Sequence, residues 1–186
     1  MVKRRKEASS SIGYVFLFLT VMLLVIITMY MMQVAKLMTH QHHVDDALAG
    51  SVLGSLVADD EYYFLTYETS GNPIIRFKDV DESYDIFSDC MNEAVNETVD
   101  YYYNFSLDSF ICYEVEGDSV TVTSYSGNGG RKSVTLGRVG SVRTPTGAVV
   151  RETSAYGKVR FDIRSILDGS YITKTKDIYC TLEINR

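Results

Sequence analysis

The sequence predicts an α+β protein in which a long N-terminal helix, first transmembrane and then amphipathic, precedes a small domain with an antiparallel sheet and a second helix. No charged residue occurs from Ala8 to Ala35, apolar residues then recur at steps of three and four, and apolar and polar residues alternate in several segments after Phe110. We divide the chain into a basic cytoplasmic leader (1–11), a transmembrane helix (12–33), an amphipathic extension of that helix (34–60) and an extracytoplasmic α+β domain (61–186).

The apolar N-terminal segment predicts a membrane anchor. A span needs ~20 apolar residues, and the run from Ile12 to Met32 supplies them. The basic cluster Lys3–Lys6 predicts a single pass with a cytoplasmic N-terminus and the remaining chain outside the cell membrane. A cleaved signal would have a shorter apolar core and a small-x-small site, and a buried soluble helix is the other alternative. The expected anchor residues are Ile12, Phe16, Leu19, Leu23, Ile26 and Met32.

The helix is expected to continue beyond the membrane to about residue 58, because no proline precedes Pro73. Asp59 and Asp60 are its first plausible end. Outside the membrane, the apolar residues fall on one helical face. These residues are Val34, Leu37, Met38, Val44, Leu48, Val52, Leu53, Leu56 and Val57. Leu48, Val52 and Leu56 are the expected packing face, which the protein's own domain or a neighbouring subunit must cover.

The outer domain is expected to contain one further helix and several strands. Aromatic residues predict a strand over 62–67, and the spacing of apolar residues predicts a helix from Asp81 to about Tyr102. Alternation predicts a sheet with one buried face, built from antiparallel strands. Its strands are expected at 111–115, 119–123, 132–136, 149–150, 158–163 and 172–184, with a turn at 127–130. In the last strand, the residues Ile178, Cys180, Leu182 and Ile184 share one face.

Three cysteines are too few for a disulfide-stapled fold. Cys90 falls on the apolar face of the second helix, and Cys180 falls on the apolar face of the last strand. Cys112 alternates with Ile111 and Tyr113, so we expect it on the other face of its strand. If one bridge forms, we therefore expect it between Cys90 and Cys180. The alternative is three free thiols that behave as small hydrophobic residues.

No motif indicates an enzyme, a metal site or a cofactor. His40 and His43 share a helical face, but no pattern nearby completes a tetrahedral metal site. Residues 79–90 resemble half a calcium loop, yet Tyr84 and Cys90 stand where glycine and glutamate belong. The glycine-rich segment 127–132 lacks P-loop spacing. A net charge of −6 argues against a nucleic-acid partner.

The charges are divided along the chain. Residues 40–118 carry 18 acidic and 2 basic side chains, whereas residues 119–186 carry 5 acidic and 11 basic ones. Such a division favours complementary contacts. Either the two parts neutralise each other within one domain, or they attract neighbouring subunits.

The whole layout resembles the TadE/TadF-like pseudopilins of tight-adherence (type IVc) pilus systems. The resemblance rests on the basic cluster before Ile12–Met32, the helix that continues to Val57, and the segment Thr153–Ile163 before a last alternating strand. It implies a pilin-like fold and a membrane-anchored minor subunit that assists assembly of a pilus or related secretion machine. Its implied partners are membrane lipid and other pilin-like subunits or platform proteins.

One departure concerns processing. The resembled proteins usually carry a glutamate at the start of the apolar segment, near a prepilin-peptidase site, whereas Glu7 here lies before Ala8–Ser11 and outside the apolar run. An uncleaved chain would remain anchored in the membrane. The alternative function is that of a single-pass protein whose outer domain is a ligand-binding, sensory or adhesive module.

Overall fold

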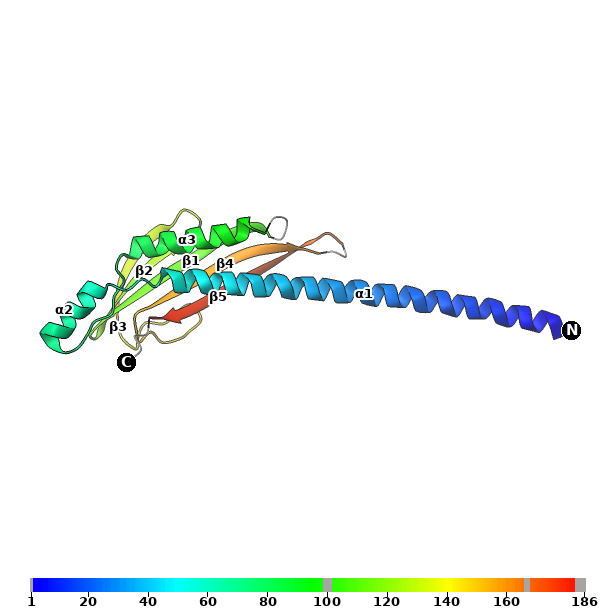
Figure 1. Cartoon of the computed structure of the whole chain (residues 1–186), viewed down its shortest axis with the longest axis horizontal. Helices are drawn as coiled ribbons and strands as arrows, with labels where there is room; N and C mark the ends of the chain where they lie inside the picture. The colour runs from blue at the N-terminus through cyan, green and yellow to red at the C-terminus, as the bar shows by residue number, and fades with distance from the viewer. Residues whose placement is uncertain (1, 99–101, 166–167, 183–186) are drawn as a thin grey trace.

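The computed structural model describes residues 2–98, 102–165 and 168–182, with side chains from residue 12 onward. It is an α+β structure with a long N-terminal helix and a small antiparallel sheet (Figure 1). The helices are α1 (Val2–Ser55), α2 (Asp60–Ser70) and α3 (Val80–Asn96). The strands are β1 (Tyr103–Glu116), β2 (Ser119–Ser126), β3 (Arg131–Arg138), β4 (Ser154–Arg164) and β5 (Tyr171–Thr181).

Helix α1 is continuous for 54 residues but has two different surroundings. From Ile12 to Met32 every side chain is exposed, and burial begins at Gln33. Figure 1 shows the same division. The outer domain packs along the second half of α1 and leaves the first half uncovered; residues 12–32 of this uncovered part are called the apolar shaft below.

Helix α1 ends at Ser55, about three residues before the predicted end. Backbone hydrogen bonds to the segment before α3 compete with further helical turns. The Asp59 N–H donates to the Arg76 carbonyl at 3.1 Å, and the Lys78 N–H donates to the Val57 carbonyl at 3.0 Å. This pairing with a distant segment is not visible in local periodicity.

The predicted strand at 62–67 is wrong, because these residues lie in α2. The Asp59 carboxylate accepts a hydrogen bond from the Tyr62 N–H and caps the helix, and Gly71 closes it in a left-handed conformation. Capping therefore outweighs the strand preference of the aromatic residues. Helix α3 begins one residue before the prediction and ends at Asn96 rather than near Tyr102.

The sheet has the order β3-β2-β1-β4-β5, and all neighbouring strands are antiparallel. Helix α1 contacts β4 and β5, α3 contacts β1, and the two helices pack on each other. Between helices and sheet lies the main core, in which Phe87 stacks on Phe110 with ring centroids 4.6 Å apart. Other members of this core include Val44, Leu48, Val52, Met91, Ala155, Val159, Phe161 and Ile163.

The opposite face of the sheet is also partly covered, which corrects the prediction of a single buried face. A second cluster there joins Tyr113, Val120 and Tyr156 to Val150 in the segment between β3 and β4. Residues 149–150 do not form a strand of the sheet; Val149 makes an isolated bridge to Arg143. Ile184 lies outside the described residues, while Ile178 and Cys180 do pack on the main core.

The close approach of α1 to the sheet at Gly157 of β4 can be tested by substitution. A Cβ atom at Gly157 would lie 2.6 Å from Val52 Cγ2 and 3.0 Å from Phe87 Cε2. We predict that Gly157→Ala destabilises the detergent-solubilised full-length chain by about 1–3 kcal/mol in denaturant unfolding, as overpacked cores do. In combination with Val52→Ala, the loss should be smaller than the sum of the two single losses.

The matched control is Gly50→Ala on α1, where a Cβ would meet nothing within 4 Å. This change should be neutral or stabilise by up to ~1 kcal/mol, because alanine favours helix. A Gly157→Ala chain that unfolds like the wild type would contradict the close approach of α1 and β4.

Candidate membrane anchor and outer surfaces

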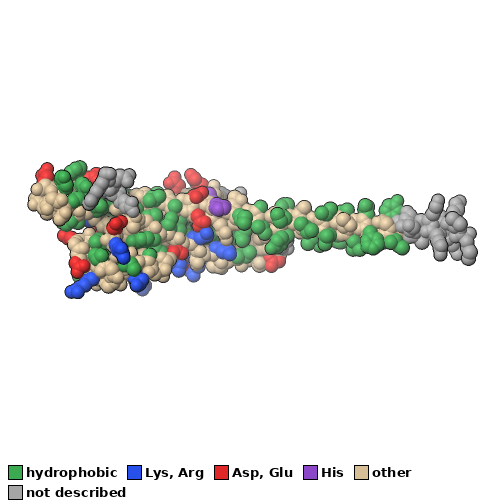
Figure 2. All heavy atoms as spheres, turned by 90° about the horizontal axis from the view of Figure 1, so that it is seen from below, with side chains coloured by type: hydrophobic (Ala, Val, Ile, Leu, Met, Phe, Trp, Pro, Cys, Tyr) green, Lys and Arg blue, Asp and Glu red, His purple; other side chains and the backbone are tan. Residues whose placement is uncertain are grey.

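The exposed part of α1 has the dimensions of a membrane span. The 21 residues from Ile12 to Met32 extend ~31 Å as a helix, close to the ~30 Å hydrocarbon thickness of a bilayer. Among the described residues, α1 is the one helix long and apolar enough to cross a membrane. Figure 2 shows this shaft covered with hydrophobic side chains and without charged ones. All six predicted anchor residues are more than half exposed: Ile12, Phe16, Leu19, Leu23, Ile26 and Met32.

The predicted packing face on the outer half of α1 lies against the protein's own sheet. Leu48 and Val52 are 1% and 0% exposed, and Leu56 packs at the edge of the same core. Two residues from the broader apolar pattern point elsewhere, since Met38 and Leu53 are 58% and 57% exposed. The stripe is thus covered within the chain, so it is not available for contact with another molecule.

Such a face exists around Gly50 and Gly54. Both glycines are exposed, and a Cβ atom at either would meet no atom within 4 Å. Leu53 lies beside them and is exposed as well. This open face of α1, defined by Gly50, Leu53 and Gly54, would allow another helix to approach closely.

The histidine pair of α1 takes part in packing. The Tyr102 hydroxyl donates to the His40 carbonyl at 3.2 Å and lies 2.9 Å from His43 Nδ1. Tyr102 also packs edge-on against Phe161 of β4. The two histidines therefore help to dock Tyr102 between α1 and the sheet. No group of three histidine, cysteine or acidic residues among the described residues could hold a metal ion.

The divided charges meet inside the outer domain. Asp45 of α1 pairs with Lys176 of β5 at 2.8 Å, and Asp81 of α3 pairs with Lys132 of β3 at 2.7 Å. Asp108 of β1 also lies 3.5 Å from Arg160 of β4. These pairs join the acidic first part of the chain to its basic last part. Exposed pairs contribute little stability, so their main effect is to favour one alignment of the helices on the sheet.

The calcium-like segment caps a helix. The Asp79 carboxylate accepts hydrogen bonds from the Asp81 and Glu82 N–H groups at the start of α3. The Asp81 carboxylate accepts hydrogen bonds from Lys132 Nζ and from the Tyr125 hydroxyl, and these bonds hold the pKa of Asp81 below its usual value. The carboxylates at 79 and 81 therefore have structural roles.

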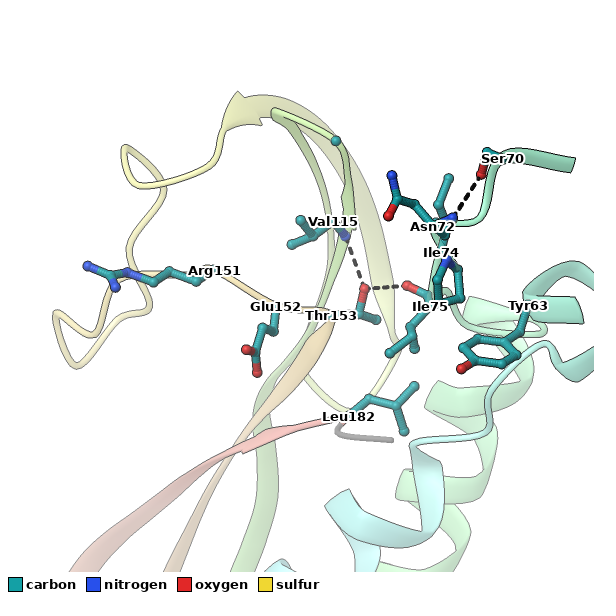
Figure 3. Close-up of a pocket in the computed structure, with 12 residues that line it drawn as sticks. Tyr63, Ser70, Asn72, Ile74, Ile75, Val115, Arg151, Glu152, Thr153 and Leu182 are labelled. Carbon is teal, nitrogen blue, oxygen red and sulfur yellow. Dashed lines mark hydrogen bonds between the residues drawn. The ribbon is translucent and has the colours of Figure 1, made fainter. Parts of the chain in front are cut away.

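A cleft of about 650 Å³ is lined in part by α2 (Figure 3). Figure 1 shows α2 at the end of the domain far from the N-terminus. Its apolar lining includes Ile75, Val115 and Leu182. The Thr153 hydroxyl donates to the Ile75 carbonyl and accepts from the Val115 N–H, so its polar atom is used within the protein. Figure 3 shows the Arg151 side chain pointing away from the apolar group. The cleft thus offers apolar contact with few convergent polar groups.

The three cysteines are free, and the pairing predicted for Cys90 and Cys180 is not formed. Helix α3 turns Ser83, Phe87 and Met91 inward, which leaves Cys90 exposed on its outer side. Cys112 and Cys180 instead face the same core, because both lie opposite Ala155 in the strand register. Burial raises the pKa of the Cys112 thiol strongly and that of Cys180 less.

Two exposed apolar surfaces were not predicted from the sequence. Helix α2 has no buried residue, and its Phe64, Leu65 and Tyr67 are more than half exposed. At the β3 edge of the sheet, Val134 and Leu136 are 56% and 79% exposed. Asp59 and Gly71, which cap the two ends of α2, are the residues from which this helix could have been predicted.

No family model, curated protein or solved structure matches this chain. Within the part of the chain that the structure describes, the fold defines a broad class: one helix that could span a membrane, followed by a small antiparallel-sheet domain with additional helices.

Thiol labelling distinguishes exposed Cys90 from buried Cys112. We predict that a maleimide labels Cys90 of the native, detergent-solubilised chain first and Cys112 only after unfolding, because thiolate formation and access both require exposure. Mass spectrometry of the labelled peptides gives the order. Cys90→Ser should remove the fast phase alone, and fast labelling of Cys112 in the folded chain would contradict the main core described above.

Proposed function

We propose that this protein is a membrane-anchored, pilin-like minor subunit that acts in assembly of a tight-adherence-type pilus or a related secretion machine. The observation that carries the proposal is the continuity of α1. One helix of 54 residues passes from a bare apolar segment into the core of the outer domain without a linker. A subunit built in this way transmits the position of its membrane helix directly to its outer domain.

The open face of α1 supports an assembly role. The apolar stripe of the outer half is covered by the protein's own sheet, but Gly50, Leu53 and Gly54 remain uncovered. This face belongs to the same continuous helix as the bare shaft. Small residues let helix backbones approach closely. Neighbouring pilin-like subunits could therefore pack along α1 both within the membrane and just beyond it.

The distal cleft is the observation that favours the alternative of a ligand-binding or sensory outer domain. Its volume of about 650 Å³ lies within the range of small-molecule sites. Such sites also place a few polar groups around the ligand, whereas Thr153 is engaged within the protein and Arg151 points away. The lining therefore supports this alternative less well than α1 supports assembly.

The proposed orientation has the outer domain outside the cell. We predict that a membrane-impermeant maleimide labels Cys90 on intact protoplasts, because Cys90 is exposed on α3 and the basic leader favours a cytoplasmic N-terminus. The control is a Val2→Cys change in a Cys90→Ser chain, which should be labelled only after permeabilisation. Labelling in the reverse pattern would refute the orientation.

The assembly role predicts a specific dependence on the open face of α1. A photo-crosslinking residue at Leu53 in cells should capture other pilin-like subunits or platform proteins. Gly50→Leu combined with Gly54→Leu should lower co-purification of those partners about tenfold or more, because overpacking an interface typically costs 1–3 kcal/mol.

The control for this experiment is Glu68→Leu, which adds the same side chain at an exposed position of α2. It should leave co-purification unchanged. Unfolding of the purified variants verifies that neither change disturbs the fold. Capture of no membrane or pilus component at Leu53 would count against the assembly role, as would normal assembly by the double leucine variant.

A further inference from the structure

The β4–β5 hairpin extends to the point on α1 where the apolar shaft begins. Lys176 Nζ lies 2.8 Å from Asp45 Oδ2, which aligns β5 with α1 at that level. Figure 1 shows β5 crossing α1 obliquely, with the start of the strand toward the N-terminal part of the helix. Tyr171, at the start of β5, is therefore at most ~17 Å nearer the N-terminus at ~3.3 Å per residue. That distance corresponds to at most ~11 helical residues, so Tyr171 lies between the levels of Asp45 and Val34 and toward the latter.

The burial of α1 gives the same boundary independently. Every side chain from Ile12 to Met32 is exposed, whereas Gln33 is only 9% exposed and Leu37 packs at the core. Figure 1 shows the β4–β5 hairpin as the part of the domain that reaches farthest along α1 toward the N-terminus. The outer domain thus begins where the apolar span ends, without a stalk.

The side chains at this end of the domain suit a lipid headgroup layer. Tyr171 is 54% exposed and packs edge-on against Tyr103, with ring centroids 5.2 Å apart. Arg164 at the end of β4 is exposed, and Lys174 in β5 is partly exposed. Tyrosine is enriched at membrane interfaces, and basic side chains are attracted to anionic lipid phosphates.

Two carboxylates near this end, among the described residues, accept hydrogen bonds from the hairpin and from β1. Asp162 accepts hydrogen bonds from Asn104 Nδ2 at 2.7 Å and from the Thr173 hydroxyl at 2.6 Å. Asp168 accepts one from the Ser170 hydroxyl at 2.8 Å. These bonds direct carboxylate oxygens toward protein donors, which lessens their opposition to a phosphate group.

We propose that the membrane-facing end of the domain, formed by Tyr103, Arg164, Tyr171 and Lys174, binds the headgroups of anionic phospholipids in the membrane that α1 spans. The two tyrosines lie at the interface, and the two basic side chains contact phosphate oxygens. This contact gives the domain a second attachment to the membrane and fixes the orientation of α1 and the domain together relative to the bilayer. The proposal rests on α1 spanning the membrane and is independent of the assembly role.

The absence of tryptophan from the sequence allows a direct test. Tyr171→Trp is made in the full-length chain, which is reconstituted in vesicles containing lipids brominated near the headgroup, with and without anionic phosphatidylglycerol. We expect strong quenching of the tryptophan in anionic vesicles. Arg164→Gln or Lys174→Gln should each shift the contact equilibrium about fivefold toward the unquenched state, because a basic residue at an anionic surface contributes ~1 kcal/mol.

Two further single-tryptophan chains calibrate the measurement. Leu23→Trp lies in the middle of the span and should be quenched in every vesicle when lipids brominated deep in the acyl chain replace the headgroup-proximal ones, whereas Leu136→Trp lies on exposed β3 and should not be quenched by either lipid. Arg131→Gln and Arg138→Gln remove the same charge from β3 and should leave the Tyr171→Trp signal unchanged. Protection of Cys112 from maleimide verifies the fold of each variant.

The outcomes separate the possible failures. If Leu23→Trp is quenched but Tyr171→Trp behaves like Leu136→Trp, the hairpin does not touch lipid and the proposal is overturned. If the two glutamine variants keep full quenching in anionic vesicles, the assignment of Arg164 and Lys174 to phosphate is overturned. If Leu23→Trp itself is not quenched, α1 does not span the membrane and the proposal fails with that premise.

Discussion

The close packing of α1 on β4 at Gly157 is the contact on which the outer domain depends. With no side chain at this position, Val52 of α1 and Phe87 of α3 both reach the sheet at one point. Phe87 then stacks on Phe110, and Val52 lies fully buried. A helix whose first part is apolar and uncovered can thus continue into a packed domain, because a sheet of the same chain covers its outer stripe.

This internal use of the stripe determines which surfaces remain for partners. Leu48 and Val52 could have served a neighbouring subunit equally well by their chemistry, but burial of both in the main core removes them. The charge division is likewise largely internal, since Asp45 and Asp81 already bind Lys176 and Lys132. Among the described residues, the apolar surfaces that remain uncovered include residues 12–32 of α1, the open face of α1, and smaller patches on α2 and β3.

The sequence predicted those features that depend on local periodicity. The long helix and the strands expected at 111–115, 119–123, 132–136, 158–163 and 172–184 follow from spacing alone, and the last of these is observed up to Thr181. The strand at 62–67 failed because a cap at Asp59 outweighs aromatic strand preference. The proposed Cys90–Cys180 pairing failed because Cys90 is one position from Met91, and that single step of ~100° on a helix separates the outside from the core.

Local patterns could not predict how far along the axis of α1 each strand and helix packs. That alignment depends on tertiary contacts such as Asp45 with Lys176 and Tyr102 with His40 and His43, which join residues far apart in the sequence. The alignment has a physical consequence, because it brings Tyr171 down to the end of the apolar span. A domain attached only through the end of a flexible linker could rotate and tilt freely. Here the second half of α1 is part of the core, so any force that tilts α1 also tilts the sheet and the surfaces that the sheet carries.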